Sequence, residues 1–393
     1  MTMMSVLLRI SLPSTVAMLG IAFGGMGSCV PRLEPLAVDD EEANPSLPDG
    51  ARVELVDVAF AWPLPTGTGA GVEGHLGPIL NCEMVGAFEP LTRSDESADL
   101  CAALTVTAAR LDPCFREGGP DAECRPQLRL VLQPVFDGSA RDAAIHVFYE
   151  IEERVLLRGV ARMIELRLGA GDDGRGPLNV HPLLTTKEGR RAVALIFDEI
   201  LKDARFDHFT QITVHGDDAA WTFEFRTFLD GKVSEGDARL QHVLAPSPDA
   251  IDMSITPASA SQDEFSLLLD EATAAAASFE EQQAAYDRAG RVENPNFHDP
   301  GTVDCATCHV AAPARAATRA RFARAGVALF EGPDTATSAR HDLTSSAVFA
   351  NPQFIHAFAY RGTALSINQR VVNESARSAD LVDARLIEEG VLQ

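Results

Sequence analysis

The sequence predicts an α+β domain in its first half and a mainly α-helical domain in its second half. Between residues 51 and 245, short runs alternate apolar and polar residues and are rich in β-branched and aromatic side chains, as is typical of strands. After residue 262, longer segments place apolar residues at helical spacing. A Pro-rich stretch at 246–261 separates the two patterns and is expected to be a linker.

In the 51–245 domain, helical segments interrupt a series of strands. Strands are expected at 51–62, 125–136, 144–151, 209–216 and 220–232. Helices are expected at 152–168 and 186–204. Five histidines have no partner at catalytic spacing and are expected to be surface or core residues: His146, His181, His208, His215 and His242. With no internal repeat, Walker loop or nucleophile elbow, the role of this domain stays open.

The N-terminus carries the features of an export signal. Residues 1–28 contain Arg9, a short apolar stretch and then small residues, which is the plan of a signal peptide rather than of a membrane span. The letters MGSC, ending at Cys29, resemble the bacterial lipobox, which implies lipidation of that cysteine; the alternative is ordinary cleavage near Gly27. Residues 29–50 are acidic and Pro-rich, as a tether would be. We expect an exported protein, lipid-anchored on the periplasmic or cell-surface side of a bacterial membrane.

Four cysteines lie close together in the first half and are expected to form two disulfides in an oxidising compartment. Four cysteines allow three pairings. A Gly-Gly-Pro turn between Cys114 and Cys124 favours that pair, which leaves Cys82 with Cys101.

The chain is strongly acidic, with a formal charge of −24 over 393 residues. Such a surface repels phosphate backbones, which argues against a nucleic-acid partner. We interpret the acidity mainly as a source of solubility.

The 262–393 domain is predicted from three helical segments. The first is expected over 261–290, with a capping box of Ser261 and Glu264 and an end at Gly290. A loop rich in Pro, Gly and Asn follows. Two more helices are expected at 311–330 and 366–390, with an aromatic-rich loop between them.

Residues 305–309 read Cys-Ala-Thr-Cys-His. Two cysteines separated by two residues, with a histidine directly after them, are the attachment pattern of c-type haem. In this motif the 262–393 domain resembles a single-haem c-type cytochrome. The resemblance implies a cytochrome c-like helical fold and one covalent haem, with thioether bonds from Cys305 and Cys308 and His309 as the proximal iron ligand.

The second axial ligand is expected to be a histidine, because no methionine follows His309. His298 is the first candidate, since it lies in the loop that leads to the motif. His356, among aromatic residues, is the second, and His341 lies in a polar stretch and is expected to be solvated. An open position is the remaining possibility.

The motif has competing interpretations. A zinc site, a thiol–disulfide pair or a plain disulfide staple would make the chain a binding or structural lipoprotein. We favour electron transfer to an unknown redox partner protein over an enzymatic activity, with haem-based sensing if the iron has an open position. Four arginines after the motif could pair with haem propionates or with carboxylates of a redox partner, or could simply balance the charge of local Asp and Glu: Arg315, Arg319, Arg321 and Arg324. The C-terminal segment also resembles that of uncharacterised lipoproteins from myxobacteria, a resemblance that carries no activity.

Overall fold

A computed structural model describes most of the chain after residue 46. The described ranges are 47–65, 104–116, 123–141, 143–175, 177–215, 220–229, 232–233, 239–244, 254–256, 263, 265–299, 302–343 and 356–393. All of them belong to one compact unit, Ala37–Gln393. The predicted signal peptide, Cys29, Cys82, Cys101 and most of the 246–261 linker lie outside them.

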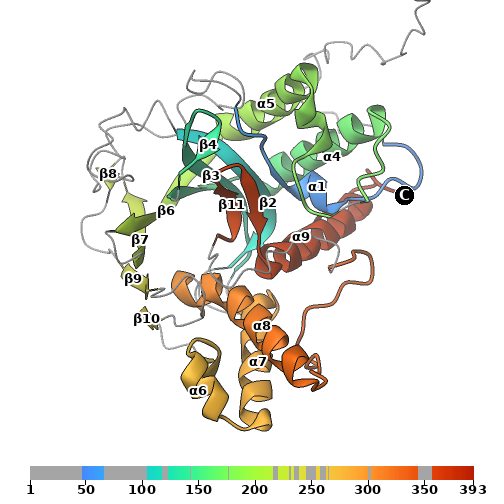
Figure 1. Ribbon diagram of the computed structural model, residues 1–393. Helices are drawn as coiled ribbons and strands as arrows, with labels where there is room; N and C mark the ends of the chain where they lie inside the picture. The colour runs from blue at the N-terminus through green and yellow to red at the C-terminus, as the bar shows by residue number, and fades with distance from the viewer. Residues whose placement is uncertain are drawn as a thin grey trace, which may run out of the picture. The chain divides into compact units, whose positions relative to one another are not determined.

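An antiparallel sheet, which curves strongly in Figure 1, forms the centre of this unit. Its strand order is β1-β2-β3-β5-β6-β7-β9-β10, with β4 paired to β3 and β8 to β7. The strands are β1 (Ala59–Ala61), β2 (Leu104–Phe115), β3 (Arg125–Phe136), β4 (Ser139–Ala140), β5 (Ala144–Glu150), β6 (Arg205–His215), β7 (Ala220–Leu229), β8 (Lys232–Val233), β9 (Arg239–Leu244) and β10 (Ser254–Thr256). With the helices described next, the sheet confirms a mixed α+β fold.

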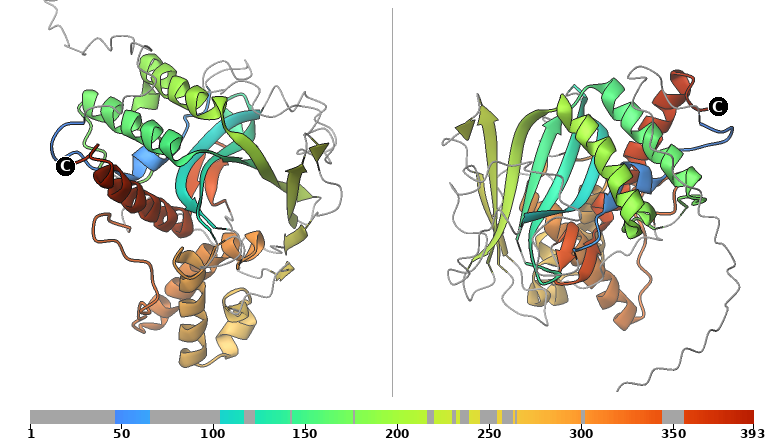
Figure 2. Two further views of the ribbon diagram at one scale, coloured as in Figure 1. Left: turned by 180° about the vertical axis from the view of Figure 1, so that it is seen from behind. Right: turned by 90° about the horizontal axis from the view of Figure 1, so that it is seen from above.

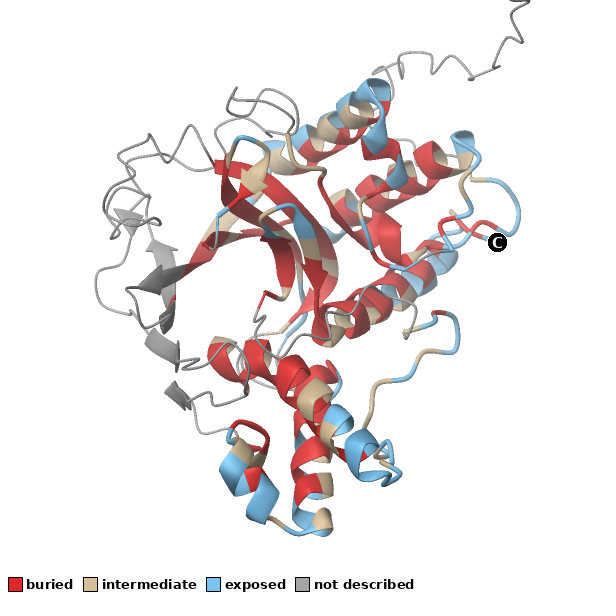
Figure 3. Ribbon diagram, viewed as in Figure 1, coloured by how far each residue is buried: buried red, intermediate tan, exposed pale blue. Residues whose placement is uncertain are grey.

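Helices pack on one face of this sheet. They are α1 (Leu55–Val58), α4 (Glu153–Gly169), α5 (Lys187–Lys202) and α9 (Gln369–Glu388), and a 3-10 turn, η1 (Pro182–Thr185), precedes α5. Alternate residues of β5, such as Ile145 and Val147, point into the core between sheet and helices. Buried residues therefore line the inner faces of sheet and helices in Figure 3.

A second apolar core lies on the other side of the sheet. Here η2 (Ser266–Leu268), α6 (Glu271–Ala276), α7 (Phe279–Glu293) and α8 (Cys305–Ala325) follow one another in the chain. Ile212 of β6 and Phe223 of β7 pack with Ala306 and Val310 of α8. Helix α8 therefore packs directly against the sheet.

The long helix predicted over 261–290 is instead three short elements. Asp270 and Ser278 each cap a new helix with a side-chain oxygen, and Ser278 forms a capping box with Glu281. Gly290 does not end the last of them, which continues to Glu293. The predicted cap residues Ser261 and Glu264 lie outside the described residues.

Residues 356–393 return to the first core. The hairpin of β11 (Phe358–Arg361) and β12 (Ala364–Ile367) is fixed by Gln133 of β3, whose side chain bonds both backbone groups of Tyr360 at 2.7 and 2.8 Å. Helix α9 then packs beside α1 and α4, as Figure 2 shows. These residues therefore share a core with residues 51–209, whereas the sequence assigns them to a separate helical domain.

Candidate functional site

The Cys-Ala-Thr-Cys-His motif forms the first turns of α8. Asp304 is the N-cap, and its side chain accepts a hydrogen bond from the backbone N–H of Thr307 at 2.8 Å. Helical spacing places residues 305, 308 and 309 on one side of the helix. The motif is thus held in a regular, capped conformation.

Cys305 and Cys308 are free, partly buried thiols packed at the edge of the second core. Burial raises the pKa of Cys305 to about 12 and that of Cys308 to about 11. A thiol–disulfide oxidoreductase needs the opposite, a thiolate stabilised near neutral pH. The electrostatics therefore count against the dithiol interpretation.

His309 is buried, with 8% of its surface exposed, and faces the sheet. Its ring centroid lies 4.9 Å from that of Phe223 on β7 and 6.3 Å from that of His146 on β5. His146 alternates with the core residues Ile145 and Val147, so it projects from the opposite face of β5. Two imidazoles from distant parts of the sequence therefore meet between α8 and the sheet.

A pocket opens beside these two rings, and His356 also lines it. The remaining lining is apolar: Ala143, Ala144, Ile212, Ala357 and Ala359. Burial lowers the pKa of His146 well below its ordinary value, and the nearby His309 and Arg129 lower it further. At neutral pH this imidazole is uncharged and keeps a lone pair for a metal.

His298 and His341 lie elsewhere. Nε2 of His298 is 2.8 Å from Oδ2 of Asp263 and Nδ1 is 3.3 Å from Oγ1 of Thr302; the residue lines a different pocket from His309. His341 is buried rather than solvated, 3.4 Å from Asp380 and 3.8 Å from Glu54. Of the three expected distal candidates, the structure brings only His356 to the pocket of His309.

His146 is the residue that the sequence did not single out. It lies in a strand of the first half, and nothing in its local sequence distinguishes it from a core histidine. Only the packing of α8 on the sheet brings it to His309.

The arginines after the motif are paired with carboxylates. Arg315 bonds Glu293 and Glu331, Arg319 bonds Glu331 and Arg321 bonds Glu271. Arg315, Arg319 and Arg321 therefore balance the charge of nearby glutamates. Arg324 is exposed at the end of the helix.

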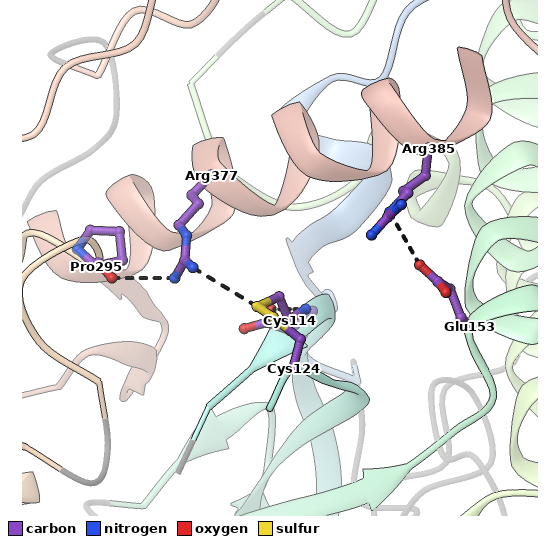
Figure 4. The surroundings of a disulfide bond; sticks show 7 residues. Cys114, Cys124, Glu153, Pro295, Arg377 and Arg385 are labelled. Atoms are coloured by element: carbon purple, nitrogen blue, oxygen red, sulfur yellow. Dashed lines mark hydrogen bonds and ion pairs between the residues drawn. A yellow bond between two sulfur atoms is a disulfide. The ribbon is translucent and has the colours of Figure 1, made fainter. Parts of the chain in front are cut away.

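A disulfide joins Cys114 at the end of β2 to Cys124 before β3, with their Cα atoms 4.4 Å apart. In Figure 4, Arg377 of α9 extends toward this bond. Its Nη1 donates to the carbonyl of Pro295 at 3.2 Å, and its Nη2 lies 3.9 Å from Sγ of Cys114. The disulfide therefore lies where the sheet, α9 and the 295–299 loop meet.

Two searches of the described residues bear on the other interpretations. Within them, no group of three or more His, Cys, Asp or Glu side chains is placed to hold a metal ion. No described helix combines the length and the apolar character needed to cross a membrane. A comparison with models of protein families, with curated proteins and with solved structures found no match.

Proposed function

We propose that this chain is a c-type cytochrome that carries one covalent haem on Cys305 and Cys308, with His309 as an iron ligand. The observation that supports this most strongly is the placement of the motif. Its histidine lines a pocket together with a second imidazole, that of His146, and the two ring centroids are 6.3 Å apart. Haem bound there supplies one-electron redox chemistry at its iron.

Two imidazoles of the pocket would hold the iron of a bound haem. His146 and His309 both line this pocket. The observed separation of His146 and His309 is 6.3 Å. We therefore propose His146 as the second ligand, ahead of His356 and of His298, whose Nε2 pairs with Asp263.

The size of the pocket sets a requirement on binding. Its empty space of about 280 Å³ includes open solvent, so the pocket is far smaller than the cavities that usually enclose a ligand the size of haem. Its walls are mainly alanine side chains and the ends of β5 and β11. They must move apart to admit a porphyrin, while the thiols and His309 remain on the first turns of α8.

The cellular setting belongs to the same proposal. Covalent attachment is expected outside the cytoplasm, in agreement with an exported lipoprotein anchored through Cys29. A haem held by His309 and His146 would supply one-electron transfer to a redox partner protein.

Attachment is tested by producing the exported protein together with a haem-maturation system. We expect haem that stays bound after denaturation, because thioether bonds are covalent. Cys308→Ala should abolish most of this signal. Arg324→Ala, an exposed change on the same helix, should leave it unchanged. A colourless wild type, or one that binds stoichiometric zinc, would contradict the cytochrome function.

The second ligand is tested on the haem-loaded protein by its visible and electron paramagnetic resonance spectra. The wild type should be low-spin, and His146→Ala should become high-spin and recover the low-spin spectrum on addition of free imidazole. His298→Ala and His356→Ala serve as matched controls and should remain low-spin. A change confined to one of these controls would assign the ligand to that residue. A wild type that is already high-spin would favour haem-based sensing instead.

A further inference from the structure

A second pocket is lined by β2, β3, α9 and the 295–299 loop. It contains about 360 Å³ of empty space. Five arginines line it, Arg110, Arg116, Arg129, Arg370 and Arg377, against three carboxylates. This local excess of positive charge stands out in a chain with a formal charge of −24.

One of these carboxylates, that of Glu374, already pairs with two of the arginines. Glu374 of α9 forms ion pairs with Arg110 and, at 2.7 Å, with Arg370. Burial acts to raise the pKa of Glu374. The positive charges of Arg110 and Arg370 outweigh that effect and hold the pKa of Glu374 well below its ordinary value. Arg370 also donates to the carbonyls of Val292 and His298 at 2.8 and 2.7 Å. Arg110 and Arg370 therefore already have carboxylate partners.

Arg129 differs from Arg110 and Arg370 in its surroundings. Its position on β3 lies directly opposite Arg110 on β2, and like charges at facing positions of a sheet repel. Its guanidinium lies 4.6 Å from the ring centroid of Phe148 and 5.8 Å from that of Phe115. We find no ion pair for it within the described part of the chain, and its buried Nε has no hydrogen-bond partner there.

Arg129 is thus a cation that forms no ion pair of its own within the described residues, although the nearby carboxylates Glu374 and Asp112 favour its charged form. Burial, followed by the repulsion from Arg110, lowers the pKa of Arg129 to about 10. Buried charges in proteins are ordinarily paired, because removing an unpaired ion from water is costly. The aromatic rings offset only part of this cost.

We propose that this pocket binds a small oxyanion, with Arg129 as its principal ligand. A guanidinium presents a planar fork of N–H donors that matches a carboxylate or phosphate group. The oxyanion has two possible sources. One is a free small molecule; the other is a carboxylate of haem attached at Cys308, whose own charge is close enough to act on Arg129.

The test is calorimetric titration of the protein produced without haem, with succinate and inorganic phosphate as probes. We expect saturable binding of at least one probe, with Kd at least tenfold weaker in Arg129→Gln. Arg125→Gln, an exposed change at the start of the same strand, is the matched control and should bind as the wild type does. The absence of saturable binding for both probes, or equal binding by Arg129→Gln, would overturn the proposal.

Two further measurements complete the test. In anion-free buffer, Arg129→Gln should unfold at the same or a higher urea concentration than the wild type, because it removes an unpaired cation; a lower midpoint would contradict the proposal. Titration of the haem-loaded protein separates the sources, since loss of probe binding assigns the site to haem carboxylates and retained binding to a free ligand. Because the first titration uses protein without haem, it tests the oxyanion site even if the proposed haem attachment fails.

Discussion

At the scale of single residues, the site combines groups whose protonation is set by burial. His146 is kept neutral and the two thiols of α8 are kept protonated. The neutral imidazole favours metal ligation, whereas the protonated thiols disfavour redox exchange. Both effects are consistent with the proposed cytochrome function.

Alkylation of the protein produced without haem checks the thiols. Because burial raises the pKa of Cys308 to about 11, its thiolate fraction at pH 8 should be roughly a hundredfold below that of an ordinary cysteine. Labelling by iodoacetamide, followed by mass spectrometry, should therefore be slow at pH 8. It should accelerate as the pH rises toward 11, and the urea-unfolded chain is the control. Rapid labelling of the folded protein at pH 7 would show that the thiols are activated instead.

At the scale of elements, the first turn of α8 carries the motif, and its N-cap determines how well that turn is ordered. The Asp304 carboxylate bonds the backbone N–H of Thr307 and lies at the positive end of the helix dipole. An unravelled first turn would displace Cys305 and Cys308 relative to each other. In the proposed cytochrome, the cap would therefore position the two thiols for haem attachment.

Asp304→Ala should lower the free energy of unfolding by about 1 kcal/mol, the usual cost of losing such a cap. It should also lower the yield of covalent haem. Asp304→Asn keeps an acceptor oxygen and should restore most of both quantities. Urea unfolding and denaturing gels stained for haem measure the two effects. Equal stability of the alanine variant and the wild type would show that the cap contributes nothing.

At the scale of the whole molecule, the candidate site depends on segments that are far apart in the chain. β5 supplies His146, α8 supplies His309, and the residues before β11 supply His356. Helix α9 joins the first core and carries Arg370, which holds the 295–299 loop through the carbonyl of His298. The site therefore requires the folded unit rather than a separable helical domain.

Anchoring is also a property of the whole molecule. If Cys29 is lipidated, the exported protein should partition into the detergent phase and the membrane fraction. Cys29→Ser should release it or stall its processing, with haem attachment at the distant motif unchanged. A wild type that is wholly in the aqueous phase, with an unmodified N-terminus, would contradict the lipoprotein prediction.

Helices and strands with a clear local pattern of residues were predicted from the sequence. The helices α4, α5 and α9 were predicted because their apolar residues recur at helical spacing, and β3 and β5 because they are rich in branched and aromatic side chains. Strand β2 was missed and residues 55–58 were taken for strand rather than α1, since short elements depend on their partners more than on propensity. The 261–290 segment was predicted as one helix because its apolar stripe outweighed the internal caps at Asp270 and Ser278.

The sequence by itself determined which side chains the motif brings together, because positions 305, 308 and 309 share one side of a helix. It also predicted the pairing of Cys114 with Cys124. Only the tertiary structure placed His146 opposite His309 and Arg129 opposite Arg110. Those contacts arise from sheet register and from the packing of α8 on the sheet, and such long-range pairings leave no trace in local residue patterns.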